Sequence, residues 1–117
     1  MRDSRPIEGT LRSRSNTGII NMLFVVTAID RDNSLALRTA TRDAHFSYAR
    51  ETGDVRLGGP FLDAKGDMAG SLIIFEAPDF EAAKKWHAND PYVKAGLFAH
   101  SEVRPWKATF NGCEAKL

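Results

Sequence analysis

The sequence has 117 residues, of which 43% are hydrophobic and 26% are charged, and its formal net charge is +1 at pH 7. A chain of this length can bury one core without metals or disulfides, and its charge balance offers no basic surplus to bind a nucleic-acid backbone. The one cysteine, Cys113, excludes an internal disulfide and favours a cytoplasmic protein, and no apolar run approaches the roughly 20 residues of a membrane span.

The composition divides the chain into three parts. Residues 1–21 carry four arginines among Ser, Thr, Gly and Asn, and their apolar run is too short for a secretory signal. We therefore expect a flexible N-terminal extension over residues 1–21, one folded domain over residues 22–107 and a C-terminal tail over residues 108–117.

The first strand is predicted at residues 22–29, MLFVVTAI, where a continuous run of β-branched and aromatic residues is typical of a central strand. A helix is predicted from about residue 34 to residue 52. Its three- and four-residue apolar spacing predicts a buried stripe at Leu37, Ala40, Thr41, Ala44 and Tyr48. An adjoining, more polar stripe consists of Arg38, Arg42, His45 and Ala49, and Gly53 is expected to end the helix.

The second half of the chain predicts a hairpin, a helix and a last strand. Residues 55–62 form a strand interrupted by Gly58-Gly59-Pro60, which permits close backbone approach, as at an edge beside a ligand. Residues 63–67 form a tight turn and residues 68–76 the returning strand. Asp79 caps a second helix that Pro91 ends, and residues 97–107 form the final strand.

The predicted order of elements is therefore βαββαβ. Right-handed crossovers place both helices on one face of the sheet. The fold class is α+β, a ferredoxin-like sandwich with a four-stranded antiparallel sheet. Its other face has no helix to cover it, and its apolar strands favour a homodimer in which a second copy covers that face.

Several short motifs recur in a characteristic order. They are Arg42-x-x-His45, Gly58-Gly59-Pro60, Gly70-Ser71, Glu81-Ala82 with Trp86, Asp90-Pro91-Tyr92 ahead of Gly96, and Val103-Arg104-Pro105-Trp106. None is specific alone. Together, in this order and spacing, they resemble the YciI-like (YCII-related) family over residues 22–107.

The resemblance implies a dimeric ferredoxin-like fold and a pocket with a His–Asp pair that is proposed to be catalytic. At least one relative is a dehydrochlorinase of chlorinated hydroxyhydroquinones. By residue matching, the pair falls on His45 and Asp90, the Gly-Pro wall on Gly59 and Pro60, and a small polar residue on Ser71. The tight turn at residues 63–67 differs from the longer loops that relatives can have, which bears on the size of the pocket.

The residue chemistry agrees with this reading but leaves alternatives open. His45 would serve as a general base, since the positive charge of Arg42 one turn earlier favours the neutral imidazole, and Asp90 would orient its ring. The alternatives are a structural histidine and an aspartate that only caps a helix. Arg42 could bind an anionic or phenolate oxygen or pair with an acid. Ser71 is expected to be a hydrogen-bonding wall, not a nucleophile.

No metal or cofactor site is predicted. His87 and His100 are expected to be surface and strand residues, and no histidine pair has metal-ligand spacing such as HxxxH. We expect a cofactor-independent enzyme that abstracts a proton from a small, cyclic or aromatic hydroxylated substrate. The alternatives are a non-catalytic dimeric module that binds a small molecule and a cofactor-free monooxygenase.

The fold makes a geometric prediction about this site. His45 and Asp90 should lie roughly 2.6–3.2 Å apart or be joined by one water. They should border a cleft walled by Gly59, Pro60 and Ser71, with Arg42 facing the same space.

Overall fold

The structure is a computed structural model that describes residues 21–117. The elements in chain order are β1 (Met22–Asp30), α1 (Leu35–Thr52), β2 (Asp54–Leu62), β3 (Met68–Ala77), α2 (Phe80–Ala88), α3 (Pro91–Lys94) and β4 (Phe98–Trp106). The predicted N-terminal extension lies outside the described residues except for Asn21, so the division of the chain into three parts stays a prediction. None of the helices in residues 21–117 has the length and apolar character needed to span a bilayer.

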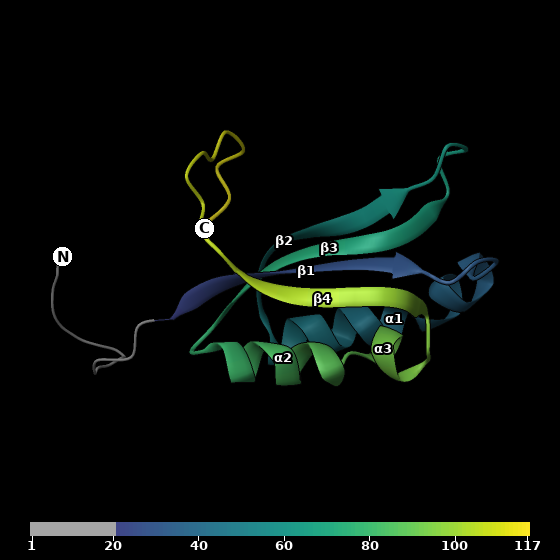
Figure 1. The fold of residues 1–117 in the computed structure, drawn as a ribbon, viewed down its shortest axis with the longest axis horizontal. Helices are drawn as coiled ribbons and strands as arrows, with labels where there is room; N and C mark the ends of the chain where they lie inside the picture. The colour runs from purple at the N-terminus through teal and green to yellow at the C-terminus, as the bar shows by residue number, and fades with distance from the viewer. Residues whose placement is uncertain (1–20) are drawn as a thin grey trace, which may run out of the picture.

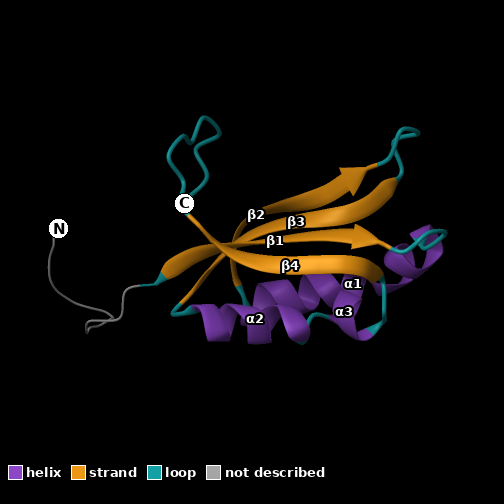
Figure 2. Ribbon diagram, in the orientation of Figure 1, coloured by secondary structure: helices purple, strands orange, loops and turns teal. Residues whose placement is uncertain are grey.

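The four strands form one sheet in the order β2-β3-β1-β4, with every neighbouring pair antiparallel. All the helices of the described chain lie on one face of this sheet (Figures 1 and 2). The predicted ferredoxin-like α+β sandwich is confirmed, and β1 is a central strand as expected. After β4 the chain rises on the helix-free side, where the Arg56 Nη1 donates a hydrogen bond to the Lys116 backbone oxygen.

The core lies between the sheet and the helices. Phe24, Val26 and Ala28 of β1 are fully buried, because alternate residues of a strand face the same layer. The register pairs Phe24 with Phe75 and Ala28 with Ser71, so the buried face changes along its length from aromatic to polar. That polar end is where the candidate site lies.

The predicted buried stripe of α1 is wrong. Leu37 is 37% exposed and Ala40 and Ala44 are exposed, whereas Arg38 and His45 are the buried residues of this helix. The helix thus turns its more polar stripe towards the sheet. Charged and polar side chains are buried only when they are paired, and partners on other elements pair both of these.

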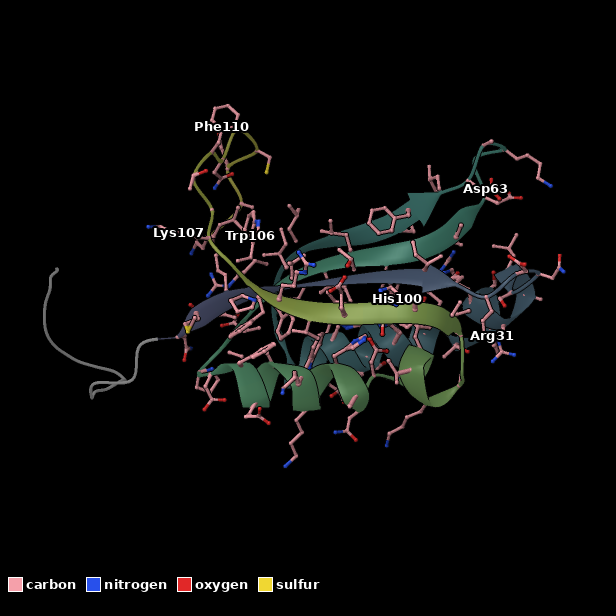
Figure 3. The ribbon with its side chains drawn as sticks, viewed as in Figure 1. Arg31, Asp63, His100, Trp106, Lys107 and Phe110 are labelled. Atoms are coloured by element: carbon pink, nitrogen blue, oxygen red, sulfur yellow. The ribbon has the colours of Figure 1, made fainter. Side chains whose placement is uncertain are left out.

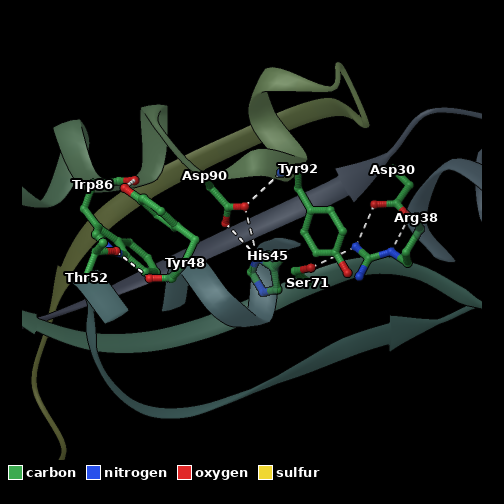
Figure 4. Close-up of polar contacts among 9 residues, drawn as sticks. All are labelled: Asp30, Arg38, His45, Tyr48, Thr52, Ser71, Trp86, Asp90 and Tyr92. Atoms are coloured by element: carbon green, nitrogen blue, oxygen red, sulfur yellow. Dashed lines mark hydrogen bonds and ion pairs between the residues drawn. The ribbon is translucent and has the colours of Figure 1, made fainter. Parts of the chain in front are cut away.

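Gly53 ends α1 as predicted, but without the left-handed backbone for which helices commonly end in glycine. Gly53 has φ −110° and ψ 156°, an extended backbone that any residue adopts. A Cβ atom at this position would lie 2.7 Å from the Trp86 ring. Trp86 is held there by a hydrogen bond from its Nε1 to Thr52 Oγ1 (3.0 Å), and its backbone oxygen accepts one from the Tyr48 hydroxyl (2.7 Å; Figure 4). The glycine therefore makes room for the tryptophan.

We expect Gly53→Ala to lower the free energy of unfolding by about 1–3 kcal/mol, because the added methyl group must displace the packed indole. Gly59→Ala is the matched control, since a Cβ at Gly59 meets no atom within 4 Å. Urea denaturation of both variants measures the difference. Equal stability of the two would contradict the close approach of Trp86 to the end of α1.

Candidate active site

The candidate site is centred on His45 of α1 and Asp90, which precedes α3. His45 Nδ1 lies 2.9 Å from Asp90 Oδ1 and 3.0 Å from Oδ2 (Figure 4). Asp90 has no exposed surface, and His45 is 8% exposed. The predicted direct contact between these two side chains, 45 residues apart in sequence, is confirmed.

The local sequence fixes the Asp90 carboxylate. Asp90 is the N-cap of α3, and its Oδ1 accepts a hydrogen bond from the Tyr92 backbone N–H (2.9 Å), while Pro91 occupies the first helical position. A carboxylate can only accept, so the neutral His45 ring must carry its hydrogen on Nδ1. Nε2 is then left with a free lone pair, as a general base requires.

The Tyr92 ring stacks with the imidazole of His45 and also contacts the guanidinium of Arg38. Its ring centroid lies 4.2 Å from that of His45, with 17° between the planes, and 4.7 Å from Arg38 Cζ. Burial raises the pKa of Tyr92 even though the charges of Arg38 and Arg42 act to lower it. The phenol therefore stays protonated at neutral pH.

A second buried pair joins β1 to α1. Arg38 Nε donates to Asp30 Oδ2 (2.7 Å) and Nη2 donates to Asp30 Oδ1 (2.9 Å), a two-point contact that holds the guanidinium plane. Nη2 also donates to Ser71 Oγ (2.8 Å). Sequence reasoning did not assign a role to Arg38 or Asp30. The sequence does contain a signal for Arg38, since it belongs to the polar stripe of α1. That stripe was predicted to lie beside the buried face of the helix, whereas the structure shows that it is the buried face.

These groups border a cavity of about 270 Å³. The predicted residues Arg42, His45, Gly59, Pro60 and Ser71 all line it. Asp90 was also expected to border the cavity but does not line it; it is fully buried and reaches the site only through its contact with His45. Arg38, Tyr92 and Met68 also line the cavity. The functional roles of the residues named from the sequence stay a prediction.

Arg42 contributes a positive charge to the cavity wall. Its Nη2 lies 3.5 Å from Met68 Sδ, a weak acceptor. Within residues 21–117, no carboxylate lies within ion-pair distance of Arg42, in contrast to Arg38 with its partner Asp30. Arg42 is therefore able to meet a negative group on a ligand.

The expectation that His87 lies on the surface is wrong. His87 is 7% exposed, its Nε2 shares a hydrogen bond with Ser101 Oγ (2.9 Å), and its Nδ1 has no partner in the described part of the chain. Burial lowers the pKa of His87, and the nearby charge of Asp90 opposes this only in part. His100 is exposed on β4, as expected. Among residues 21–117, no group of three His, Cys, Asp or Glu side chains is arranged to hold a metal ion.

Residues 22–107 match the model of the YCII-related domain. The chain belongs to the YCII-related family. It is 36% identical over 98 residues to Protein YciI of Escherichia coli O6:H1, an alignment that covers 76% of this chain and all of that protein.

Two solved structures extend the comparison. The 5-chloro-2-hydroxyhydroquinone dehydrochlorinase TftG of Burkholderia phenoliruptrix AC1100, in complex with 2,5-dihydroxybenzoquinone, is 38% identical with a TM-score of 0.67. That match covers 74% of this chain and 94% of the dehydrochlorinase. A putative antibiotic biosynthesis monooxygenase from Bacteroides thetaiotaomicron is 17% identical with a TM-score of 0.53, over 82% of this chain and 96% of that one. This second likeness shows the fold alone.

The buried state of His87 predicts a loss of stability in acid. Because its folded-state pKa lies below the ordinary value of 6.5, the unfolded chain binds the proton more tightly. The free energy of unfolding should therefore fall as the pH drops below about 6.5, by at most about 1.4 kcal/mol per pH unit from this one group. His87→Gln should reduce that slope in denaturant titrations between pH 7.5 and pH 5.

The matched control is His100→Gln, which replaces an exposed histidine on β4. This variant should keep the wild-type slope. If His87→Gln and wild type lose stability equally over this pH range, burial does not depress the proton affinity of His87.

Proposed function

We propose that this protein is a small cofactor-independent enzyme in which His45 abstracts a proton from a small, cyclic or aromatic hydroxylated substrate. The observation that carries the proposal is the direct contact of His45 Nδ1 with the fully buried Asp90 carboxylate, which leaves Nε2 as a free base at a cavity. The Asp90 negative charge stabilises the imidazolium that forms when Nε2 takes the proton.

The reaction would be an elimination or a tautomerisation. His45 Nε2 takes a proton from the substrate, and the electron pair of the broken bond forms a new double bond in the ring. In an elimination that pair expels a leaving group such as chloride; in a tautomerisation the imidazolium returns the proton to another atom. After an elimination the imidazolium releases its proton to water, so the products are the unsaturated ring, chloride and a proton. Neither course needs an oxidant or a reductant.

The cavity favours a substrate of about one ring. Its volume of about 270 Å³ is at the lower end of ligand pockets. Gly59 and Pro60 form a wall of low side-chain bulk, which leaves room for a flat molecule. The charge of Arg42 would attract a phenolate or other anionic oxygen, and Ser71 would supply a hydrogen bond.

The dehydrochlorinase TftG supports this substrate class, since it is 38% identical to this chain and 94% of the TftG chain is aligned. A chlorinated hydroxyhydroquinone is therefore the first substrate to test.

A non-catalytic module that binds a small molecule is the alternative. It is favoured by the same cavity with its positive charge from Arg42, which is suited to binding an anion whether or not a proton moves. Tight ligand binding without turnover, in the presence of an intact His45–Asp90 pair, would support this alternative. A cofactor-free monooxygenase would instead consume oxygen with a quinol substrate.

We expect His45→Gln to lower kcat for chloride release from 5-chloro-2-hydroxyhydroquinone by roughly 10²–10⁴, because it removes the base. Asp90→Asn should also lower kcat, since an amide does not stabilise the imidazolium. Chloride release and solvent-deuterium incorporation into the substrate measure the step. His100→Gln, outside the cavity, is the control that should keep wild-type rates. Full activity of both dyad variants would contradict the proposal.

We also propose that the enzyme is a homodimer that uses the helix-free face of the sheet. Residues that alternate with the core residues carry apolar side chains on this face, namely Val25, Ile29, Leu57, Phe61, Leu72 and Trp106. Leu57 is 43% exposed, and Trp106 projects on this side in Figure 3. Within residues 21–117, no helix covers this surface, so a second copy would remove apolar area from water.

We expect Leu57→Lys to shift the protein from dimer to monomer in sedimentation at micromolar concentration, because it places a charge in the interface. Leu37→Lys makes the same change on the outer surface of α1, at a similar exposure, and should leave the dimer intact. A monomeric wild type, or equal dimerisation of both variants, would count against this interface.

A further inference from the structure

The hydrogen bond between Arg38 and Ser71 has a direction that determines what Ser71 can do. A guanidinium has only donors, so Arg38 Nη2 must donate and Ser71 Oγ must accept across their 2.8 Å contact. The hydroxyl hydrogen of Ser71 is therefore directed elsewhere. In the described part of the chain, Arg38 is the one side-chain or backbone group that shares a hydrogen bond with Ser71 Oγ.

The Ser71 hydroxyl is consequently a donor without an acceptor in a nearly dry position. Ser71 is 4% exposed and Arg38 is 3% exposed, yet both line the cavity that His45 also lines. Figure 4 shows Ser71 next to the guanidinium of Arg38, to which it is hydrogen-bonded. A buried donor without an acceptor destabilises the protein, and a ligand atom that accepts its hydrogen bond removes this cost.

We propose that Ser71, polarised by Arg38, is the donor that binds the oxygen on which negative charge develops when His45 removes a proton. This inference rests on the proposed function and deepens it. It assigns the substrate to carbonyl compounds that have an acidic C–H bond on the carbon next to the carbonyl group, such as the keto form of a hydroxylated ring.

The C–H bond breaks and its proton forms the N–H bond of the His45 imidazolium. The electron pair forms a C=C bond, and the carbonyl π pair moves onto oxygen to give an enolate. Ser71 donates to that oxygen, and the stabilisation grows as the charge develops, which is the condition for lowering the barrier.

The Arg38 contact strengthens this donor and weakens any nucleophilic role. Donation from a cation into one Ser71 lone pair draws electron density from the oxygen, so the O–H group becomes a better donor. The same withdrawal makes Oγ a poorer nucleophile. The two-point contact with Asp30 fixes the guanidinium, so that the donor is oriented before the substrate binds.

The experiment uses 2,5-dihydroxybenzoquinone as the probe, because it carries oxygen atoms conjugated to a ring and absorbs visible light. Titration of the full chain with this probe gives a Kd for wild type, Ser71→Ala and Ser71→Cys, whose thiol has a similar shape but is a weak donor. Both variants should weaken binding roughly tenfold or more. Ser71→Thr, which keeps the hydroxyl, should restore most of it.

A second readout separates hydrogen bonding from a merely structural effect. The pH at which the bound probe loses its proton, followed by its absorbance, should rise in Ser71→Ala, since the donor favours the anionic form. Ser101→Ala is the matched control, a strand serine bonded to His87 and outside the cavity, and should change neither Kd nor this midpoint.

Unchanged Kd and midpoint in Ser71→Ala would overturn the inference, as would a wild type that does not bind the probe. The failure of the proposed function looks different. In that case His45→Gln would keep wild-type turnover while probe binding still depended on Ser71. Loss of turnover in His45→Gln with Ser71-independent binding would leave the proposed function standing and remove only the donor role.

Discussion

The structure depends on the rule that a buried charge must be paired. Asp90 has no exposed surface, and it is satisfied by the imidazole of His45 and the backbone N–H of Tyr92. Asp30 is paired in the same way by Arg38. These contacts decide which face of α1 turns inward, because the helix must bring both Arg38 and His45 to carboxylates held by other elements.

Tyr92 connects the two pairs into one layer. Its ring contacts both the imidazole and the guanidinium, so neither group can move without losing a contact with the aromatic ring. The Nε2 of His45 and the hydroxyl of Ser71 lie on the same cavity, which Tyr92 also lines. The proposed base and the proposed oxygen donor would thus share one support.

The sequence allowed the fold to be predicted because its signals are local. Apolar runs, the capping residue Asp79 and Pro91 mark the elements within a few residues, and the structure confirms their order. The buried face of α1 could not be predicted from periodicity, since Arg38 is buried only because Asp30 lies on another element. The His45–Asp90 contact was predicted through the family motifs. His87 was missed because no motif marks its partner Ser101.

The cavity wall formed by Gly59 and Pro60 belongs to β2, an edge strand that is hydrogen-bonded within the sheet only to β3. The base and its carboxylate belong to the opposite layer, on α1 and next to α3. The two walls of the cavity therefore come from different layers of one small domain. Insertions or register changes in β2 can reshape the cavity while the contact between His45 and Asp90 stays intact, so that relatives with the same buried pair can accept ligands of different shape.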